Sequence, residues 1–208
     1  MITRGPLLLV LFGFYFSVFS QAEHDILMMS GETVQGTVTG EDSAFIYYDY
    51  FKKNGTSKAR KLDAERVFSI TDANGEERVV YLMDIAIGNY YTEQEMRYYI
   101  KGEQDAMEYY RGNWAWAIGV PATTALGFVF SGSVISFAVP FVYLVVAGIP
   151  PSKIPKNKID DPELAKQEAY VLGFERTARN KRLFKALTGG LIGTVGGFAG
   201  GQVVRAQP

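Results

Sequence analysis

Apolar and polar positions alternate with a period of two through residues 25–86, and turn residues separate the apolar runs. Asn54-Gly55 and Asn74-Gly75 are dipeptides typical of tight hairpin turns. About five short strands fit this pattern. Closure of such strands into a small, strongly bent barrel would leave no exposed strand edge. We therefore expect a β-barrel-like domain over residues 23–86.

The stretch Asp-Ile-Leu-Met-Met-Ser-Gly-Glu-Thr-Val-Gln-Gly-Thr-Val at 25–38 resembles the opening of Sm-like and SH3-like barrels. In those folds the first strand ends in a glycine turn and the second carries a glycine where it bends, the place that Gly36 takes here. The resemblance covers about a quarter of the chain and implies an SH3/Sm-like barrel. RNA binding is not expected, because 17 acids against 10 bases lie between Glu23 and Arg111 and phosphate contacts need Lys and Arg.

One predicted strand, at 44–51, is strongly aromatic, and its rings could stack on a ligand. The alternative is that every second ring fills the core while the others lie on the surface, as strand packing favours. We expect the second arrangement. The rings belong to Phe45, Tyr47, Tyr48, Tyr50 and Phe51.

A connecting amphipathic helix is predicted over residues 92–111. Thr92 and Glu95 have the spacing of a capping box, in which each side chain accepts a hydrogen bond from the other residue's backbone N–H. Gly102 in the middle predicts a kink. Three acids, Glu103, Asp105 and Glu108, could suggest a metal site, but without histidine or a binding loop we expect a solvated face.

No charged side chain occurs between Gly112 and Ser152, whereas a surface helix of a soluble protein needs a polar face toward solvent. One membrane span requires about 20 apolar residues, so residues 114–149 are long enough for two. Ser131-Gly132-Ser133 marks a turn between them. We expect a membrane helical hairpin over 114–149. Because both legs are short, a re-entrant or interfacial hairpin is an alternative, as is a buried hairpin in a soluble protein.

A second uncharged segment, 186–204, has glycine at every fourth position: Gly189, Gly193, Gly197 and Gly201. On a helix these glycines share one face, and a face without side chains lets another helix approach closely. The pattern resembles the glycine-zipper membrane segments of bacterial envelope proteins, which implies helix packing rather than chemistry. It has neither the Walker nor the dinucleotide-binding spacing. We expect a membrane helix that assembles homo- or hetero-oligomers.

Residues 150–185 combine a proline-rich basic linker with a helix that begins at Asp161 and Pro162. Its bases could contact anionic lipid headgroups, or they form an ordinary flank of a membrane span. If 114–149 crosses twice, this basic segment lies on the side of the β domain, which the positive-inside rule disfavours. The bases concerned are Arg176, Arg179, Lys181, Arg182 and Lys185.

Residues 1–22 have the three parts of a secretory signal peptide: Arg4, an apolar run from Pro6 to Phe19, and Ser20-Gln21-Ala22 as a cleavage site. An uncleaved anchor is the alternative. Both interpretations place the β domain outside the cytoplasm. We expect a protein of the bacterial cell envelope, in the inner membrane rather than the outer.

Two stretches, Tyr99 to Gly102 and Tyr170 to Gly173, share the pattern aromatic, β-branched, any residue, glycine. Each lies in a charged helix that leads into an apolar, glycine-containing segment, so we suspect a duplicated unit, with chance as the alternative. The pattern Tyr-x-x-Gly-Phe-x-x-x-Ala at 170–178, after a proline-rich linker, resembles uncharacterised exported membrane proteins of the Bacteroidetes type. That resemblance implies no activity.

Candidate chemistry is sparse. The chain has no cysteine and one histidine, His24, and no nucleophile–base arrangement or paired-histidine metal site is visible. We predict an α+β, non-enzymatic membrane protein with no catalytic, cofactor-binding or metal-binding residue. Its expected role is structural or protein-interaction, with membrane lipids and a protein as partners and no nucleic acid. A small channel or transport accessory subunit is the alternative, although the intramembrane charges that usually mark ion paths are missing.

Overall fold

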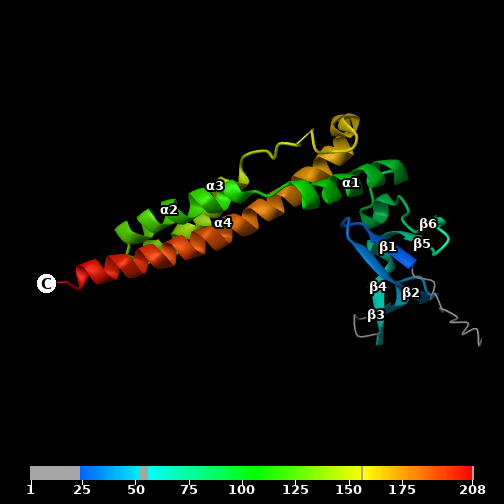
Figure 1. Cartoon of the computed structure of the whole chain (residues 1–208), viewed down its shortest axis with the longest axis horizontal. Helices are drawn as coiled ribbons and strands as arrows, with labels where there is room; N and C mark the ends of the chain where they lie inside the picture. Colours follow the sequence, from blue (N-terminus) through cyan, green and yellow to red (C-terminus); the bar gives the residue numbers. More distant parts are fainter. Residues whose placement is uncertain (1–23, 52–55, 156, 208) are drawn as a thin grey trace, which may run out of the picture.

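The computed structural model describes residues 24–51, 56–155 and 157–207, and the predicted signal peptide lies outside them. Within these ranges the chain is α+β, as predicted: a β-sheet is followed by helices. The sheet lies at one end of an elongated molecule and the C-terminus at the other (Figure 1).

Six strands form in the described residues, and every neighbouring pair is antiparallel. Their order across the sheet is β4-β3-β2-β1-β5-β6. β5 and β6 are joined by a turn in which Gly75 has a φ of 83°, which confirms the hairpin predicted there, whereas Asn54-Gly55 lies outside the described residues. The strands are β1 His24–Met28, β2 Thr33–Glu41, β3 Phe45–Phe51, β4 Ser57–Asp63, β5 Val67–Thr71 and β6 Glu77–Val79.

The sheet is not closed into a barrel, so the predicted barrel is wrong: among the described strands, no ladder joins β4 to β6. The composition of β4, Ser-Lys-Ala-Arg-Lys-Leu-Asp, gives the reason, because Leu62 is its one partly buried residue. Such a strand has almost no apolar surface to bury inside a barrel. Lysines on an edge strand, and the short length of β6 at the other edge, instead protect an open sheet from further pairing.

One apolar cluster holds the strands together and contains Ile26, Met28, Ile46, Tyr48, Val67 and Ile70. Tyr48 is buried in it and Tyr47 is exposed, as the expected alternation requires, but Tyr50 is exposed although it shares the face of Tyr48. At Gly36 a Cβ atom would lie 2.7 Å from the carbonyl oxygen of Asp49, so the position requires glycine for close approach of β3.

The helix α1, Glu93–Tyr109, packs against the sheet through a second cluster. That cluster contains Phe68, Tyr81, Met96, Tyr99, Ile100 and Ala169. The predicted capping box is confirmed: the N–H of Glu95 donates to the Thr92 hydroxyl, and the N–H of Thr92 donates to the Glu95 carboxylate at 2.8 Å. α1 continues as one helix through Gly102. Two short 3-10 helices, η1 Ala64–Arg66 and η2 Ile85–Ile87, lie in the preceding connections.

Beyond α1 the chain forms a long helical bundle (Figure 1). α2, Asn113–Val129, leads away from the sheet, and α3, Val139–Gly148, returns after the 3-10 helix η3, Val134–Ala138. A linker containing η4, Pro162–Lys166, precedes α4, Glu168–Arg205. α4 runs beside α1 and then beside α2, in the same direction as both.

Six residues between Tyr99 and Thr123 recur in α4 at the same spacing. Each repeated residue is followed by its counterpart 71 positions later. All of them except Arg111 are buried. The match extends beyond the Tyr-x-x-Gly pattern along the chain. The pairs are Tyr99/Tyr170, Gly102/Gly173, Arg111/Arg182, Ala115/Ala186, Gly119/Gly190 and Thr123/Thr194.

The contacts where α1 crosses α4 are made twice, with the two helices exchanging roles. A methyl group at Gly102 would overlap the Tyr170 carbonyl oxygen, and one at Gly173 would overlap the Tyr99 carbonyl oxygen. The Tyr170 hydroxyl donates to Asp105 at 2.7 Å, and the Tyr99 hydroxyl accepts from Arg176 at 2.8 Å. Each charged partner lies three residues after its glycine.

Candidate functional site

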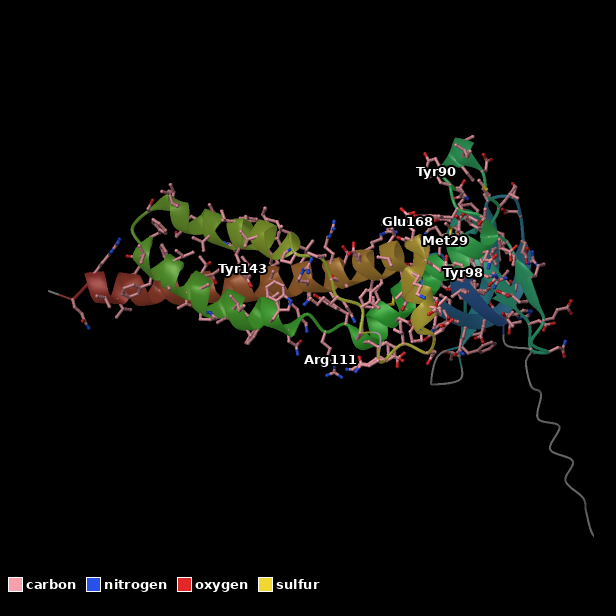
Figure 2. All side chains as sticks on the ribbon, turned by 90° about the horizontal axis from the view of Figure 1, so that it is seen from above. Met29, Tyr90, Tyr98, Arg111, Tyr143 and Glu168 are labelled. Atoms are coloured by element: carbon pink, nitrogen blue, oxygen red, sulfur yellow. The ribbon has the colours of Figure 1, made fainter. Side chains whose placement is uncertain are left out.

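The helical bundle beyond the sheet buries small residues and exposes large apolar ones. In α2 the buried residues are Ala115, Gly119, Thr123 and Gly127, and the apolar half of α4 buries alanine, glycine and threonine in the same way. The large side chains radiate outward (Figure 2). They include Trp114, Trp116, Ile118, Leu126, Phe128, Val129, Phe137, Phe141, Val142, Val145, Val146, Ile149, Phe184, Leu191, Ile192, Val195, Val203 and Val204.

The four predicted packing glycines all face α2 of the same chain. A Cβ at Gly189 would lie 3.3 Å from the Cα atom of Trp116, and a Cβ at Gly201 would lie 2.9 Å from the Phe128 carbonyl oxygen. At Gly193 and Gly197 a methyl group would overlap backbone carbonyl oxygens of α2. Glycine therefore allows backbone-to-backbone contact along this whole interface.

One described helix, α4, is long and apolar enough to cross a membrane by length and composition. Val134–Gly148 forms a shorter apolar helix. α2 has 17 residues and spans about 26 Å at 1.5 Å per residue.

Two of the predicted juxtamembrane bases bind the junction of α1 and α2: Lys181 at the end of α1, and Lys185 in the connection that follows it. The Lys181 ammonium donates to the carbonyl oxygens of Ala106, Met107 and Tyr110, the last at 3.1 Å. Lys185 donates to the Arg111 carbonyl oxygen and the Asn113 side chain. The last carbonyl groups of a helix lack hydrogen-bond partners within the helix, and a cation there is also attracted to the negative end of the helix dipole. Burial, Lys185 and Arg111 together lower the pKa of Lys181.

Arg182 acts in the same way at the end of α3. It is 2% exposed, donates to the Gly148 carbonyl oxygen at 3.3 Å, and lies 5.9 Å from the ring centre of Trp114. The helix end and the aromatic ring both favour a cation, which accounts for an arginine that is buried with no carboxylate partner among the residues that the structure describes. Its Nε atom has no hydrogen-bond partner within the described residues.

The two remaining bases differ from these three. Arg176 is largely exposed, and its guanidinium binds the Tyr99 hydroxyl and approaches the Glu103 carboxylate to 3.8 Å. Arg179 is exposed, and no hydrogen bond or ion pair links it to the described part of the chain. Of the five predicted bases, four thus contact other elements of the fold.

A cavity of about 700 Å³ lies between the sheet and the α1/α4 crossing, and we call it the neck cavity. Its buried lining comes from β1, the segment after β6 and α1: Met28, Tyr81, Met96, Tyr99 and Glu103. Tyr91 also lines it, stacked on Tyr99 with ring centres 5.5 Å apart. Three bases line it as well: Arg66, Arg176 and Lys181. The volume lies within the usual range for small-molecule sites.

Glu103 and Asp105 are buried, at 4% and 2% exposure, so the predicted solvated face is wrong for both. Asp105 pairs with Lys101 at 3.0 Å and accepts from the Tyr170 hydroxyl. Glu103 has Arg176 nearby, but its Oε2 atom has no hydrogen-bond partner among the described residues. Burial raises the pKa of Glu103 and outweighs Arg176, Tyr99 and Thr177, which all lower it.

The neck cavity was missed at the level of sequence because acids on a helix normally face water. The usable signal was the repeated Tyr-x-x-Gly pattern, since Glu103 directly follows Gly102. A glycine at a helix crossing brings the residues beside it into the interface. His24 lies on β1, away from this cavity, and the described residues hold no group of three possible metal ligands.

No family model matches this sequence, no curated protein is significantly similar to it, and no solved structure matches its fold.

Proposed function

We propose that the protein is a non-enzymatic membrane protein of the bacterial cell envelope with a structural or protein-interaction role. In this proposal α2, α3 and the apolar half of α4 form the membrane anchor. The crossing of α1 and α4 holds the sheet at the membrane surface, where it is available to a protein partner. The single observation that supports this most is the distribution of residues in the bundle: small ones inside, large apolar ones outside.

In water such a bundle would expose an apolar surface far larger than the few hundred Å² that soluble monomers usually present. In lipid the outward side chains cost nothing, and close helix packing through small residues becomes the source of stability. The lengths agree with this assignment. α2 and residues 186–204 of α4 each approach the roughly 30 Å of a bilayer's hydrocarbon core.

Chain direction supports a hairpin that crosses twice. α2 leads away from the sheet and α3 leads back, so the linker at 150–167 returns to the neck, while α4 ends far from it (Figure 1). The basic segment then shares a side with the sheet, against the positive-inside rule. Lys181 and Arg182 bind helix ends and Lys185 binds the connection between α1 and α2, so their position follows from the fold as well as from the membrane.

The glycine row 189–201 packs on α2 of the same chain, so we assign it to folding of one subunit. Assembly of subunits through that row, which we expected from the sequence, is not needed to bury it. The alternative of a small channel has no specific observation in its favour.

Single cysteines test the proposed topology, since the chain has none of its own. Ser57→Cys, Asn157→Cys and Gln207→Cys each place a thiol at an exposed residue. In spheroplasts treated with a membrane-impermeant maleimide, Ser57→Cys and Asn157→Cys should be labelled and Gln207→Cys should not. All three should be labelled after detergent is added. Labelling of all three, or of none, before detergent would contradict a bundle that crosses the membrane.

A further inference from the structure

Another cavity lies where α1 meets the helical bundle, and we call it the junction cavity. It has a volume of about 580 Å³, and Figure 2 shows Arg111 at this junction of α1 and α2. Three bases line it: Arg111, Lys181 and Lys185. The acid Glu108 lines it too, but forms no ion pair with these bases in the described part of the chain. The cavity therefore carries a net positive charge.

The three bases of the junction cavity are held close together. The Lys181 ammonium donates to the Tyr110 carbonyl oxygen at 3.1 Å, and the Lys185 ammonium donates to the carbonyl oxygen of the next residue, Arg111. Burial lowers the pKa of Lys181, and the charges of Lys185 and Arg111 lower it further, as like charges nearby do. Lys185 also binds the side chain of Asn113, the first residue of α2, where the helix dipole is positive. A bound anion would offset this repulsion.

Arg111 and Lys185 can still donate hydrogen bonds to such an anion. Lys181 uses its three donors on carbonyl oxygens at the end of α1, so it contributes charge alone. Lys185 uses two donors and retains one. Arg111 is exposed, and its guanidinium has no hydrogen-bond or ion-pair partner among the residues that the structure describes. Guanidinium groups bind phosphate oxygens through paired hydrogen bonds, so a phosphodiester suits these donors.

The junction cavity also has an apolar part. Phe184 and Met107 line it and are 69% and 42% exposed. Arg111 and Lys185 are the last charged residues before the two uncharged segments, 112–152 and 186–204. A phosphodiester bound at these two bases would therefore place attached acyl chains beside the apolar bundle. This arrangement favours a phospholipid over a soluble phosphate.

We propose that the junction cavity binds an anionic phospholipid, with the phosphodiester at Arg111 and Lys185 and an acyl chain against Phe184. This inference rests on the proposed membrane anchor, to which it adds a lipid class and a binding site. It also gives a partner to bases on the sheet side of the membrane, where the positive-inside rule disfavours them.

Tryptophan fluorescence can test the site, because the chain's two tryptophans, Trp114 and Trp116, lie in the first turn of α2 next to Asn113. The full chain would be reconstituted in phosphatidylcholine vesicles. These would contain increasing fractions of either phosphatidylglycerol or phosphatidylcholine brominated near the start of the acyl chains. Bromine quenches tryptophan at short range, so the two curves give the relative affinity for each lipid. The anionic lipid should be preferred by roughly fivefold or more, the effect of one base close to an anionic surface.

Variants show whether this preference belongs to the junction cavity. Arg111→Gln should lower it by roughly fivefold. Arg179→Gln removes an exposed base of α4 outside the cavity, so it is the matched control and should change nothing. Glu108→Gln removes the acid of the cavity and should increase the preference. Soluble glycerophosphoglycerol at millimolar concentration should not compete, because it lacks acyl chains.

Equal quenching by the two lipids, an unchanged preference in Arg111→Gln, or an equal loss in Arg179→Gln would overturn the proposal. Competition by glycerophosphoglycerol would also overturn it and identify a soluble phosphodiester as the ligand. The comparison of lipids uses the unaltered chain, so it holds even if a variant fails to fold. Quenching by neither lipid would overturn the anchor as well, whereas equal quenching by both would leave the anchor intact and remove only the site.

Discussion

At the scale of single residues, two acids of α1 that are two positions apart have opposite environments. Asp105 has a lysine and a tyrosine hydroxyl as partners, whereas one oxygen of Glu103 has no hydrogen-bond partner in the described part of the chain. A buried acid with partners stabilises the fold, and one without them reduces stability when it ionises. The difference predicts opposite effects of neutral replacements.

Glu103→Gln should stabilise the protein at high pH and leave it unchanged at low pH. Burial raises the folded-state pKa of Glu103, so the neutral carboxyl is favoured in the folded protein. Below the ordinary value of 4.5 the acid is neutral in both states and costs no stability, and stability is lost as pH rises through the folded-state value. In that range the variant should be more stable than the unaltered protein, because an amide at this position carries no buried charge. Thermal unfolding in detergent at pH 5 and pH 8 measures this.

Asp105→Asn is the matched control and should lower stability by roughly 1–3 kcal/mol, because it removes the charge that Lys101 and Tyr170 bind. If Glu103→Gln were destabilising at pH 8, or if its effect did not vary with pH, the account of Glu103 as an acid without a partner would be wrong.

At the scale of elements, the glycines of α4 divide into those that touch another helix and those that do not. Gly193 and Gly197 contact α2 backbone, whereas nothing lies within 4 Å of a Cβ at Gly196. Gly196 and Gly200 are also four positions apart, and sequence spacing alone gives no reason to distinguish them from the row at 189–201. Only the position of α2 shows which row is buried.

Gly193→Ala should destabilise the bundle, and Gly196→Ala should not. A methyl group at Gly193 would overlap the Val120 carbonyl oxygen, and helix separation of this kind usually costs roughly 1–3 kcal/mol. At Gly196 the same change meets open space and removes a poor helix former. Resistance to unfolding in a detergent series should thus fall for the first variant alone. Equal loss in both variants would mean that α4 does not pack on α2 as described.

The features that sequence predicts here are the local ones. The capping box at Thr92 and the hairpin at Gly75 depend on residues a few positions apart, and both form. The barrel fails because closure depends on β4 and β6 meeting, and neither has apolar surface that would bring them together. The burial of Glu103 follows from α4, some 70 residues away in the sequence, crossing at Gly102. No local pattern contains that contact.

At the scale of the whole molecule, α4 is the element that unites the chain. Through Ala169 it contacts the cluster of buried residues between α1 and the sheet. It crosses α1 at Gly102 and Gly173, and it packs on α2 and α3 in the apolar bundle. The residues repeated 71 positions apart lie on both sides of the contact between α1 with α2 and α4. A pairing made by direct helix–helix contacts should not need the linker between the helices.

Cutting the linker should therefore leave the two parts of the chain together. A protease site inserted after the exposed residue Asn157 would separate the sheet and α1–α3 from α4. After cleavage in mild detergent, both fragments should co-purify through a tag on either one, because the α1/α4 and α2/α4 interfaces remain intact. Gly173→Leu combined with Gly193→Leu should release α4, since both side chains would overlap backbone of the partner helix. Gly196→Leu should retain it. Separation of the unaltered fragments on cleavage would show that the linker, not the paired units, holds the molecule together.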